Sequence, residues 1–206
     1  MNILYDKPLD EVDIVNRKNH SNIVLFIGNG GYKDAAKSLI EAHKLCKNTS
    51  PFELHIVGMT ESDLGSHEGV ICHGYLNKDN ESERNLYYDL MKSARFVANP
   101  TPIWGGYSSI VEAMYFYNPV LVSPYKDFVE EFGKTIDFGI YNERFTAECI
   151  ADNIQKFFFC EDYPALCHCA HDTVKDFTWD KRVDYLLSII ANNKNKYNCH
   201  RNALNF

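Results

Sequence analysis

The stretch IVLFIGNGG, residues 23–31, is a short run of apolar and β-branched side chains that ends in a glycine-rich turn. A run of this length is typical of a buried strand in a parallel sheet. After the turn, apolar residues recur at helical spacing from Ala35 to Leu45, and the sequence NTSP at 48–51 ends that element. The stretch therefore predicts a strand, a glycine turn and a helix in succession.

The same order of elements returns along the chain. Short apolar runs lie at 52–57, 70–72, 96–98 and 120–122, helical patterns lie at about 84–93 and 108–117, and the last third is mostly helical. Alternating strands and helices predict an α/β fold: a doubly wound parallel sheet covered on both faces, with a helical C-terminus. In such sheets ligands bind beyond the carboxyl ends of the strands.

The composition is that of one globular domain. Of the 206 residues, 45% are hydrophobic and 24% are charged, and single domains run to roughly 100–200 residues. We expect a polar, irregular, connector-like segment at 1–20, one Rossmann-like domain at 21–191 and a polar tail at 192–206. Lys plus Arg number 21 against 28 for Asp plus Glu, and this net charge of −7 argues against nucleic-acid binding as the main activity.

Cysteine usage and the N-terminus bear on the cellular setting. The seven cysteines are an odd number and form no framework of a small secreted domain. Residues 1–6 lack the layout of a signal peptide, and no apolar run approaches the roughly 20 residues of a membrane helix. We therefore expect a cytoplasmic protein.

The stretch PTPIWGGYSSIVEAM, residues 100–114, reads as a strand end, a glycine turn and a helix start. The free N–H groups and the positive dipole end of such a helix suit a diphosphate, and Gly105 and Gly106 permit close backbone approach. Ser108 or Ser109 can add a hydroxyl donor. Ser109 and Glu112 also have the spacing of a capping box, in which the glutamate only returns to the helix N-terminus.

Seven sequence blocks occur in an order and spacing that resemble a known family. They are Gly28 to Lys33, HIVG at 55–58, GY at 74–75, ARFVANPT at 94–101, Gly106 to Met114, NPV at 118–120 and FTW at 177–179. The series, over about 23–190, resembles the C-terminal donor-binding half of GT-B-fold glycosyltransferases, specifically the retaining family 4 group.

The resemblance implies roles for two acidic positions. Glu112 resembles the second glutamate of the family motif, which accepts hydrogen bonds from the nucleotide ribose. The first glutamate, which contacts the donor sugar, would fall at Trp104, so the identity of the donor sugar and catalysis itself are open. An indole can stack on a sugar but cannot accept several hydroxyl hydrogen bonds.

Two further positions concern the diphosphate. Asn29 stands where the family has an arginine, while Lys33 matches the family lysine that grips the leaving group. Lys33 alone can act as a point charge, or it is an ordinary solvated lysine. Gly74 and Tyr75 resemble the turn that holds the nucleobase. The expected catalytic residues are Lys33 and Glu112, and the other substrate-binding residues are Gly28, Asn29, Gly30, Gly74, Tyr75, Trp104, Gly105, Gly106, Tyr107, Ser108 and Ser109.

The resemblance also implies a reaction and partners. Glycosyl transfer from a UDP- or GDP-sugar, with retention at the anomeric carbon, would serve polysaccharide or glycoconjugate synthesis without a cofactor or metal. The acceptor-binding half would lie on an N-terminal domain or a separate subunit, because the chain starts at a connector-like segment, residues 4–9. It would then be an excised domain or a split subunit, membrane-peripheral only through the other half.

Three alternatives stay open. Trp104 and Asn29 favour a noncatalytic nucleotide-sugar-binding or interaction module. A GT-B relative, such as a nucleotide-sugar epimerase or a phosphorylase, would share the sheet, although we identify no lysine that would hold a phosphorylase cofactor. Zinc binding is the third alternative, but no second Cys-x-x-Cys pair completes a tetrahedral set. Its candidate ligands are Cys160, Cys167, His168, Cys169 and His171.

Overall fold

The computed structural model describes residue 5, residues 7–102 and residues 107–202, with side chains as far as residue 190. Trp104, Gly105 and Gly106 lie outside the described residues.

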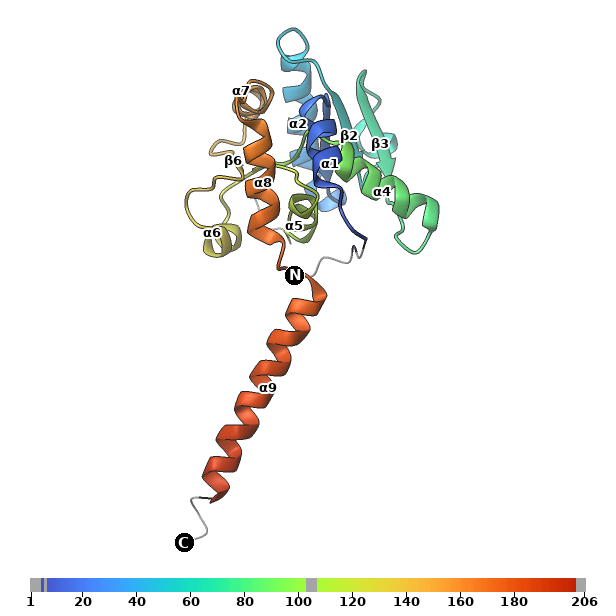
Figure 1. Ribbon diagram of the computed structural model, residues 1–206. Helices are drawn as coiled ribbons and strands as arrows, with labels where there is room; N and C mark the ends of the chain where they lie inside the picture. Colours follow the sequence, from blue (N-terminus) through green and yellow to red (C-terminus); the bar gives the residue numbers. More distant parts are fainter. Residues whose placement is uncertain (1–4, 6, 103–106, 203–206) are drawn as a thin grey trace.

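A six-stranded sheet in the order β3-β2-β1-β4-β5-β6 forms the centre of the molecule (Figure 1). All five strand pairings are parallel, which confirms the predicted doubly wound sheet. The order reverses between β1 and β4, and such a switch point is where open α/β sheets bind ligands. The strands are β1 (Ile23–Ile27), β2 (Glu53–Val57), β3 (Val70–Gly74), β4 (Phe96–Asn99), β5 (Val120–Val122) and β6 (Gly139–Tyr141).

Helices cover both faces of the sheet because successive strand residues point to opposite sides. Leu25 belongs to a core shared with α4, α5 and α8, whereas its neighbour Phe26 belongs to a core shared with α2 and α7. The helices are α1 (Glu11–Asn19), η1 (Gly30–Tyr32), α2 (Lys33–Cys46), α3 (Glu61–Leu64), α4 (Glu81–Ser93), α5 (Ser108–Tyr115), α6 (Lys126–Phe132), α7 (Ala147–Phe158), α8 (Tyr163–Val174) and α9 (Trp179–Asn202).

The first segment of the chain differs from the expected irregular connector. Asp10 caps α1, and its carboxylate accepts a hydrogen bond from the Asp13 N–H at 3.0 Å. Lys18 of this helix is fully buried and donates to the carbonyls of Met91 and Ala94 at 2.6 and 2.9 Å. The buried lysine therefore ties residues 11–19 to the end of α4. The sequence pattern did not predict this because a lysine normally marks an exposed position.

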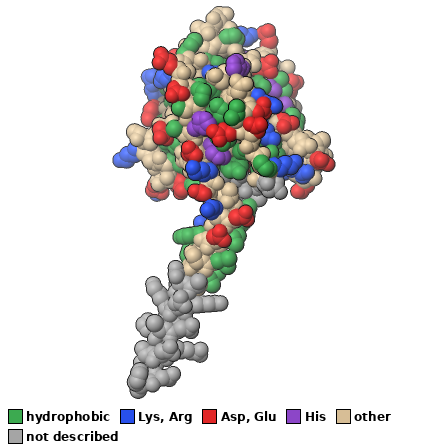
Figure 2. Space-filling model, viewed as in Figure 1, with side chains coloured by type: hydrophobic (Ala, Val, Ile, Leu, Met, Phe, Trp, Pro, Cys, Tyr) green, Lys and Arg blue, Asp and Glu red, His purple; other side chains and the backbone are tan. Residues whose placement is uncertain are grey.

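The last helix, α9, projects from the body of the domain and continues past the expected boundary at residue 191 (Figure 1). Figure 2 shows hydrophobic side chains along its described part. Its exposed apolar residues are Trp179, Val183, Tyr185, Leu186, Leu187, Ile189 and Ile190. Within the described ranges, no helix combines the length and the apolar character that crossing a membrane requires.

Candidate functional site

The turns after β1 and β3 and the start of α5 lie at the carboxyl edge of the sheet, where the sequence places the ligand. Asn99 ends β4 and bridges the switch point, since its amide donates to the Ile27 carbonyl at 3.2 Å. The Oδ1 atom of Asn99 is buried and has no hydrogen-bond partner among the described residues. Buried polar atoms are rarely left unpaired, so this oxygen marks an unsatisfied acceptor at the switch point.

The glycine turn after β1 is held together by Asn29. The Asn29 side chain caps the short helix η1 and accepts a hydrogen bond from the Gly31 N–H at 2.9 Å. Gly28 leaves no room for a side chain, because a Cβ there would lie 2.9 Å from the Phe26 ring. Gly30 faces open space, with nothing within 4 Å of a Cβ. The structure thus gives Asn29 a role in shaping the turn and leaves the Gly30 backbone approachable.

The neighbouring strand, β2, is also followed by a glycine, Gly58, and the backbone geometry explains why. Its φ is +101°, and a Cβ would lie 2.4 Å from the carbonyl oxygen of Gly28. A side chain at this position would push β1 and β2 apart at the edge.

Lys33 begins α2 directly after this turn and is partly buried. Its side chain makes no hydrogen bond or ion pair with another described residue, although its charge contributes, after the hydrogen bonds from Thr60, to lowering the pKa of the Asp63 carboxyl. Its ammonium group therefore remains available to an anion beside the switch point. This placement is compatible with the diphosphate role expected for Lys33, which stays a prediction.

Glu112 is the most constrained of the expected site residues. Its side chain on α5 is only 12% exposed, and both carboxylate oxygens accept from Lys78 Nζ, at 2.8 Å for Oε1 and 2.7 Å for Oε2. Tyr87 of α4 donates its hydroxyl to Oε2 at 2.9 Å. Burial, and then the neighbouring carboxylate, raise the pKa of Tyr87 well above its usual value, which keeps the hydroxyl protonated as a donor.

The capping-box alternative for Glu112 is wrong. The N-cap of α5 is Tyr107, which makes no side-chain cap, so Ser109 lies inside the helix. Glu112 instead reaches across to Lys78 and Tyr87. The physical reason is tertiary packing: the loop after β3 brings the Lys78 ammonium and α4 brings the Tyr87 hydroxyl to the carboxylate, and these contacts outcompete a return to its own helix end.

The turn after β3 carries Gly74 and Tyr75, the residues expected to hold the nucleobase. Gly74 has a φ of +68°, and its carbonyl accepts from the Gly58 N–H at 2.7 Å. Tyr75 is 80% exposed, while the next residue, Leu76, is buried. The exposed ring and the open turn stand at the same edge as Glu112, although contact with a base stays a prediction.

The first turn of α5 borders a cavity of about 320 Å³. Ser108 is exposed and Ser109 is partly exposed. Tyr107 forms part of the cavity wall, together with Phe177, which precedes α9, and Arg182, which lies in the first turn of α9. The other lining residues are Glu131, Asp176, Thr178, Lys181 and Tyr185.

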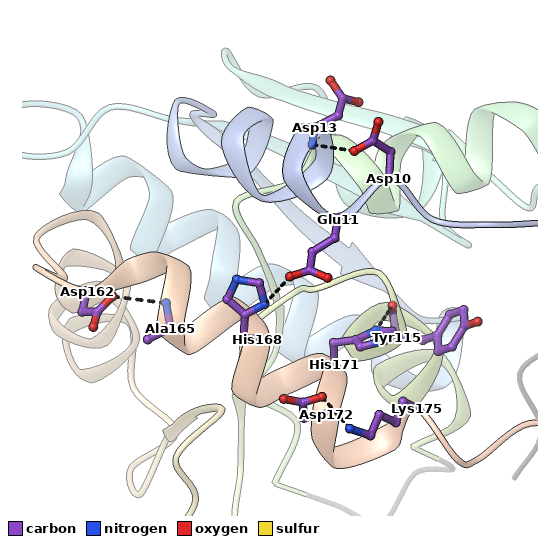
Figure 3. Close-up of polar contacts among 10 residues, drawn as sticks. All are labelled: Asp10, Glu11, Asp13, Tyr115, Asp162, Ala165, His168, His171, Asp172 and Lys175. Carbon is purple, nitrogen blue, oxygen red and sulfur yellow. Dashed lines mark hydrogen bonds and ion pairs between the residues drawn. The ribbon is translucent and has the colours of Figure 1, made fainter.

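The cysteine and histidine residues of α8 do not converge. Cys167 is buried, and this burial raises the pKa of its thiol to about 11. His171 Nδ1 lies 2.7 Å from the Tyr115 carbonyl oxygen, while His168 pairs with Glu11 at 3.3 Å (Figure 3). Across the described ranges, no group of three or more His, Cys, Asp or Glu side chains could hold a metal ion.

Sequence reasoning missed three residues of this site: Lys78, Tyr87 and Asn99. In the sequence, Lys78 is one polar residue of a polar loop, and Tyr87 is one aromatic residue of a helix, so neither indicates a binding role. A lysine four positions after the predicted nucleobase glycine, Gly74, was the available signal for Lys78. Asn99 belongs to the block ARFVANPT at 94–101, but its unpaired oxygen is visible only in the folded chain.

Solved structures share this fold. A mutant of S. aureus TarM, in complex with fondaparinux, alpha-GlcNAc-glycerol and UDP, matches with a TM-score of 0.65 and 17% identity, over 91% of this chain and 37% of that one. Anabaena HepE, in complex with UDP and glucose, matches with a TM-score of 0.65 and 16% identity, over 91% and 55%. Sucrose-phosphate synthase from Thermosynechococcus elongatus matches with a TM-score of 0.68 and 16% identity, over 93% and 50%.

These matches confirm the resemblance at the level of fold: the chain has a GT-B-like fold. It spans between about a third and just over half the length of these three proteins. No protein-family model and no curated protein matches the sequence.

Proposed function

We propose that this GT-B-like domain binds a nucleoside-diphosphate sugar, from the UDP or GDP series, and forms the donor-binding half of a glycosyltransferase. The observation that carries the proposal is Glu112, a nearly buried carboxylate on α5 that faces the turn after β3 instead of its own helix end. An ionised carboxylate can accept hydrogen bonds from ribose hydroxyls. UDP is present in two of the structures that share the fold.

The diphosphate would lie between the turn after β1 and the first turn of α5. Helix N-termini attract anions through free N–H groups and the helix dipole. Lys33 adds a positive charge that no described residue neutralises through a hydrogen bond or ion pair. Asn29 cannot supply the forked guanidinium of the family, so Lys33 and the helix would carry the electrostatic stabilisation of the leaving group.

These groups indicate how transfer would proceed. As the bond between the anomeric carbon and the diphosphate breaks, negative charge accumulates on the leaving oxygen. Donors fixed in advance lower the barrier by stabilising that charge, an effect worth several kcal/mol in enzymes. Transfer would retain the anomeric configuration and need no metal or cofactor.

The acceptor would be supplied by a second domain or subunit. The structures that share the fold are about two to three times as long as the part that this chain matches. Apolar side chains on α9, including Trp179 and Leu186, are exposed, and large exposed apolar patches mark interaction surfaces. We propose that α9 contacts the acceptor-binding part, in polysaccharide or glycoconjugate synthesis.

A noncatalytic nucleotide-sugar-binding module is the second candidate. It is favoured by Asn29, whose side chain is engaged in capping η1. Both candidates bind the donor, but only the first transfers sugar once an acceptor-binding partner is restored. Donor binding without turnover in the restored assembly would favour the module.

The proposal is tested with a panel of UDP-, GDP- and ADP-sugars, scored by thermal stabilisation of the chain. A ligand that binds only the folded state raises the melting temperature. We expect a UDP- or GDP-sugar to stabilise the wild type and to stabilise Lys33→Met much less. Lys37→Met, an exposed lysine on the same helix, is the matched control and should behave as wild type. No stabilisation by any nucleotide sugar would contradict the proposal.

A further inference from the structure

We infer that Lys78 and Glu112 recognise the ribose as one donor–acceptor pair, and that Lys78 makes the site select ribonucleotides over their 2′-deoxy counterparts. This inference rests on the proposed function and adds to it a residue that sets nucleotide specificity.

The hydrogen-bonding capacity of Glu112 is nearly used up. An ionised carboxylate offers about four lone-pair sites, two on each oxygen. Lys78 takes one site on each oxygen, and Tyr87 takes the second site on Oε2. With the contacts of the described residues counted, one site remains, on Oε1. Glu112 therefore cannot accept from two ribose hydroxyls while Lys78 stays bound.

Lys78 supplies what Glu112 lacks. An ammonium group has three N–H donors, and two of them are directed at the carboxylate. The third is available, and the side chain is 35% exposed, so a ligand can reach it. The ribose 3′-hydroxyl can donate to Glu112 Oε1 while the vicinal 2′-hydroxyl accepts from Lys78 Nζ.

The structure also holds Lys78 in position. Its ammonium lies 4.2 Å from the centre of the Tyr87 ring, a cation–π distance. The guanidinium of Arg84 donates to the Lys78 carbonyl at 2.9 Å, and the Asn77 N–H donates to Glu83 at 2.7 Å. These contacts anchor the loop to the first turn of α4, so the pair is formed before a ligand arrives.

An arrangement in which Lys78 blocks Glu112 predicts the opposite change in affinity and in ribonucleotide preference. If Lys78 only blocked Glu112, the ribose would have to displace it. Removing the lysine would then free two acceptor sites, and both the affinity and the preference for a ribose would rise. If Lys78 contacts the ribose, its removal lowers both. The sign of the change therefore distinguishes the two arrangements.

The experiment compares dissociation constants for UDP and 2′-deoxy-UDP, and for GDP and 2′-deoxy-GDP, by titration calorimetry. A hydrogen bond to a charged group suggests a ribonucleotide preference of about tenfold or more for the wild type. We expect Lys78→Met to reduce this preference to about threefold or less, and Lys78→Arg to restore part of it. Lys37→Met should retain the full preference.

Stability is followed in parallel, because Lys78→Met leaves Glu112 with Tyr87 as its single donor. Tyr87→Phe is the second variant: it removes one hydrogen bond to the same carboxylate but keeps Lys78, so its loss of ribonucleotide preference should be smaller than that of Lys78→Met. An unchanged or increased preference in Lys78→Met would overturn the inference while leaving the proposed function standing. If the wild type binds neither UDP nor GDP, the proposed function and this inference both fail.

Discussion

Lys18 has an environment that differs strongly from that of a free lysine side chain. It is fully buried, and its ammonium group is directed at the carbonyls of Met91 and Ala94 and at Asn118 Oδ1. Burial lowers its pKa from 10.5 to about 7. Between these two values the unfolded chain binds a proton that the folded chain releases, so the free energy of unfolding should increase as the pH rises.

Lys18→Met removes this titration. We expect the stability of the wild type relative to the variant to increase by about 2 kcal/mol between about pH 7.5 and pH 9.5, because each pH unit contributes up to about 1.4 kcal/mol. Urea unfolding of both proteins across this range is the measurement. Parallel stability curves would show that Lys18 keeps its ordinary pKa in the folded chain.

At the scale of elements, α4 connects stability with the site, because its start anchors the Lys78 loop and its middle carries Tyr87. Asn80 caps this helix and accepts from the N–H groups of Ser82 and Glu83 at 3.0 and 3.3 Å. Asn80→Ala should cost about 1 kcal/mol, as N-cap substitutions typically do. It should also weaken nucleotide binding by loosening the loop.

Thr146→Ala is the matched control, since Thr146 caps α7 by accepting a hydrogen bond from the Cys149 N–H at 3.3 Å. It should cost a similar amount of unfolding free energy and leave nucleotide affinity unchanged. Chemical denaturation and calorimetric titration of both variants measure the two quantities. If Asn80→Ala and Thr146→Ala changed nucleotide affinity equally, the start of α4 would have no specific role in nucleotide binding.

The sheet could be predicted from the sequence because buried parallel strands appear as short apolar runs, each followed by a turn. The capping by Asn29, the engagement of Glu112 and the burial of Lys18 could not. Glu112 meets a lysine 34 positions away and Lys18 meets an amide 100 positions away. Local patterns describe which neighbours along the chain can pair, whereas these contacts exist only after the strands have set the helices side by side.

For the molecule as a whole, the exposed carboxyl edge predicts binding without turnover. We expect the 206-residue chain to transfer no sugar to any acceptor, and to hydrolyse the donor slowly or not at all. The reason is that a facing domain is needed to orient the acceptor and exclude water. Product analysis with radiolabelled UDP- and GDP-sugars tests this, and efficient transfer by the chain alone would contradict the half-enzyme proposal.

The central claim is that a nucleotide binds at this edge through Glu112. Calorimetric titration of UDP and GDP into the wild type and Glu112→Gln tests it most directly, because the substitution keeps the side-chain shape and removes the charge. Glu130→Gln, which alters an exposed glutamate of α6, is the control. We expect Glu112→Gln to weaken binding by about 1–3 kcal/mol, the value of a hydrogen bond to a charged group, and Glu130→Gln to leave it unchanged. Equal affinity of the wild type and Glu112→Gln would contradict the claim.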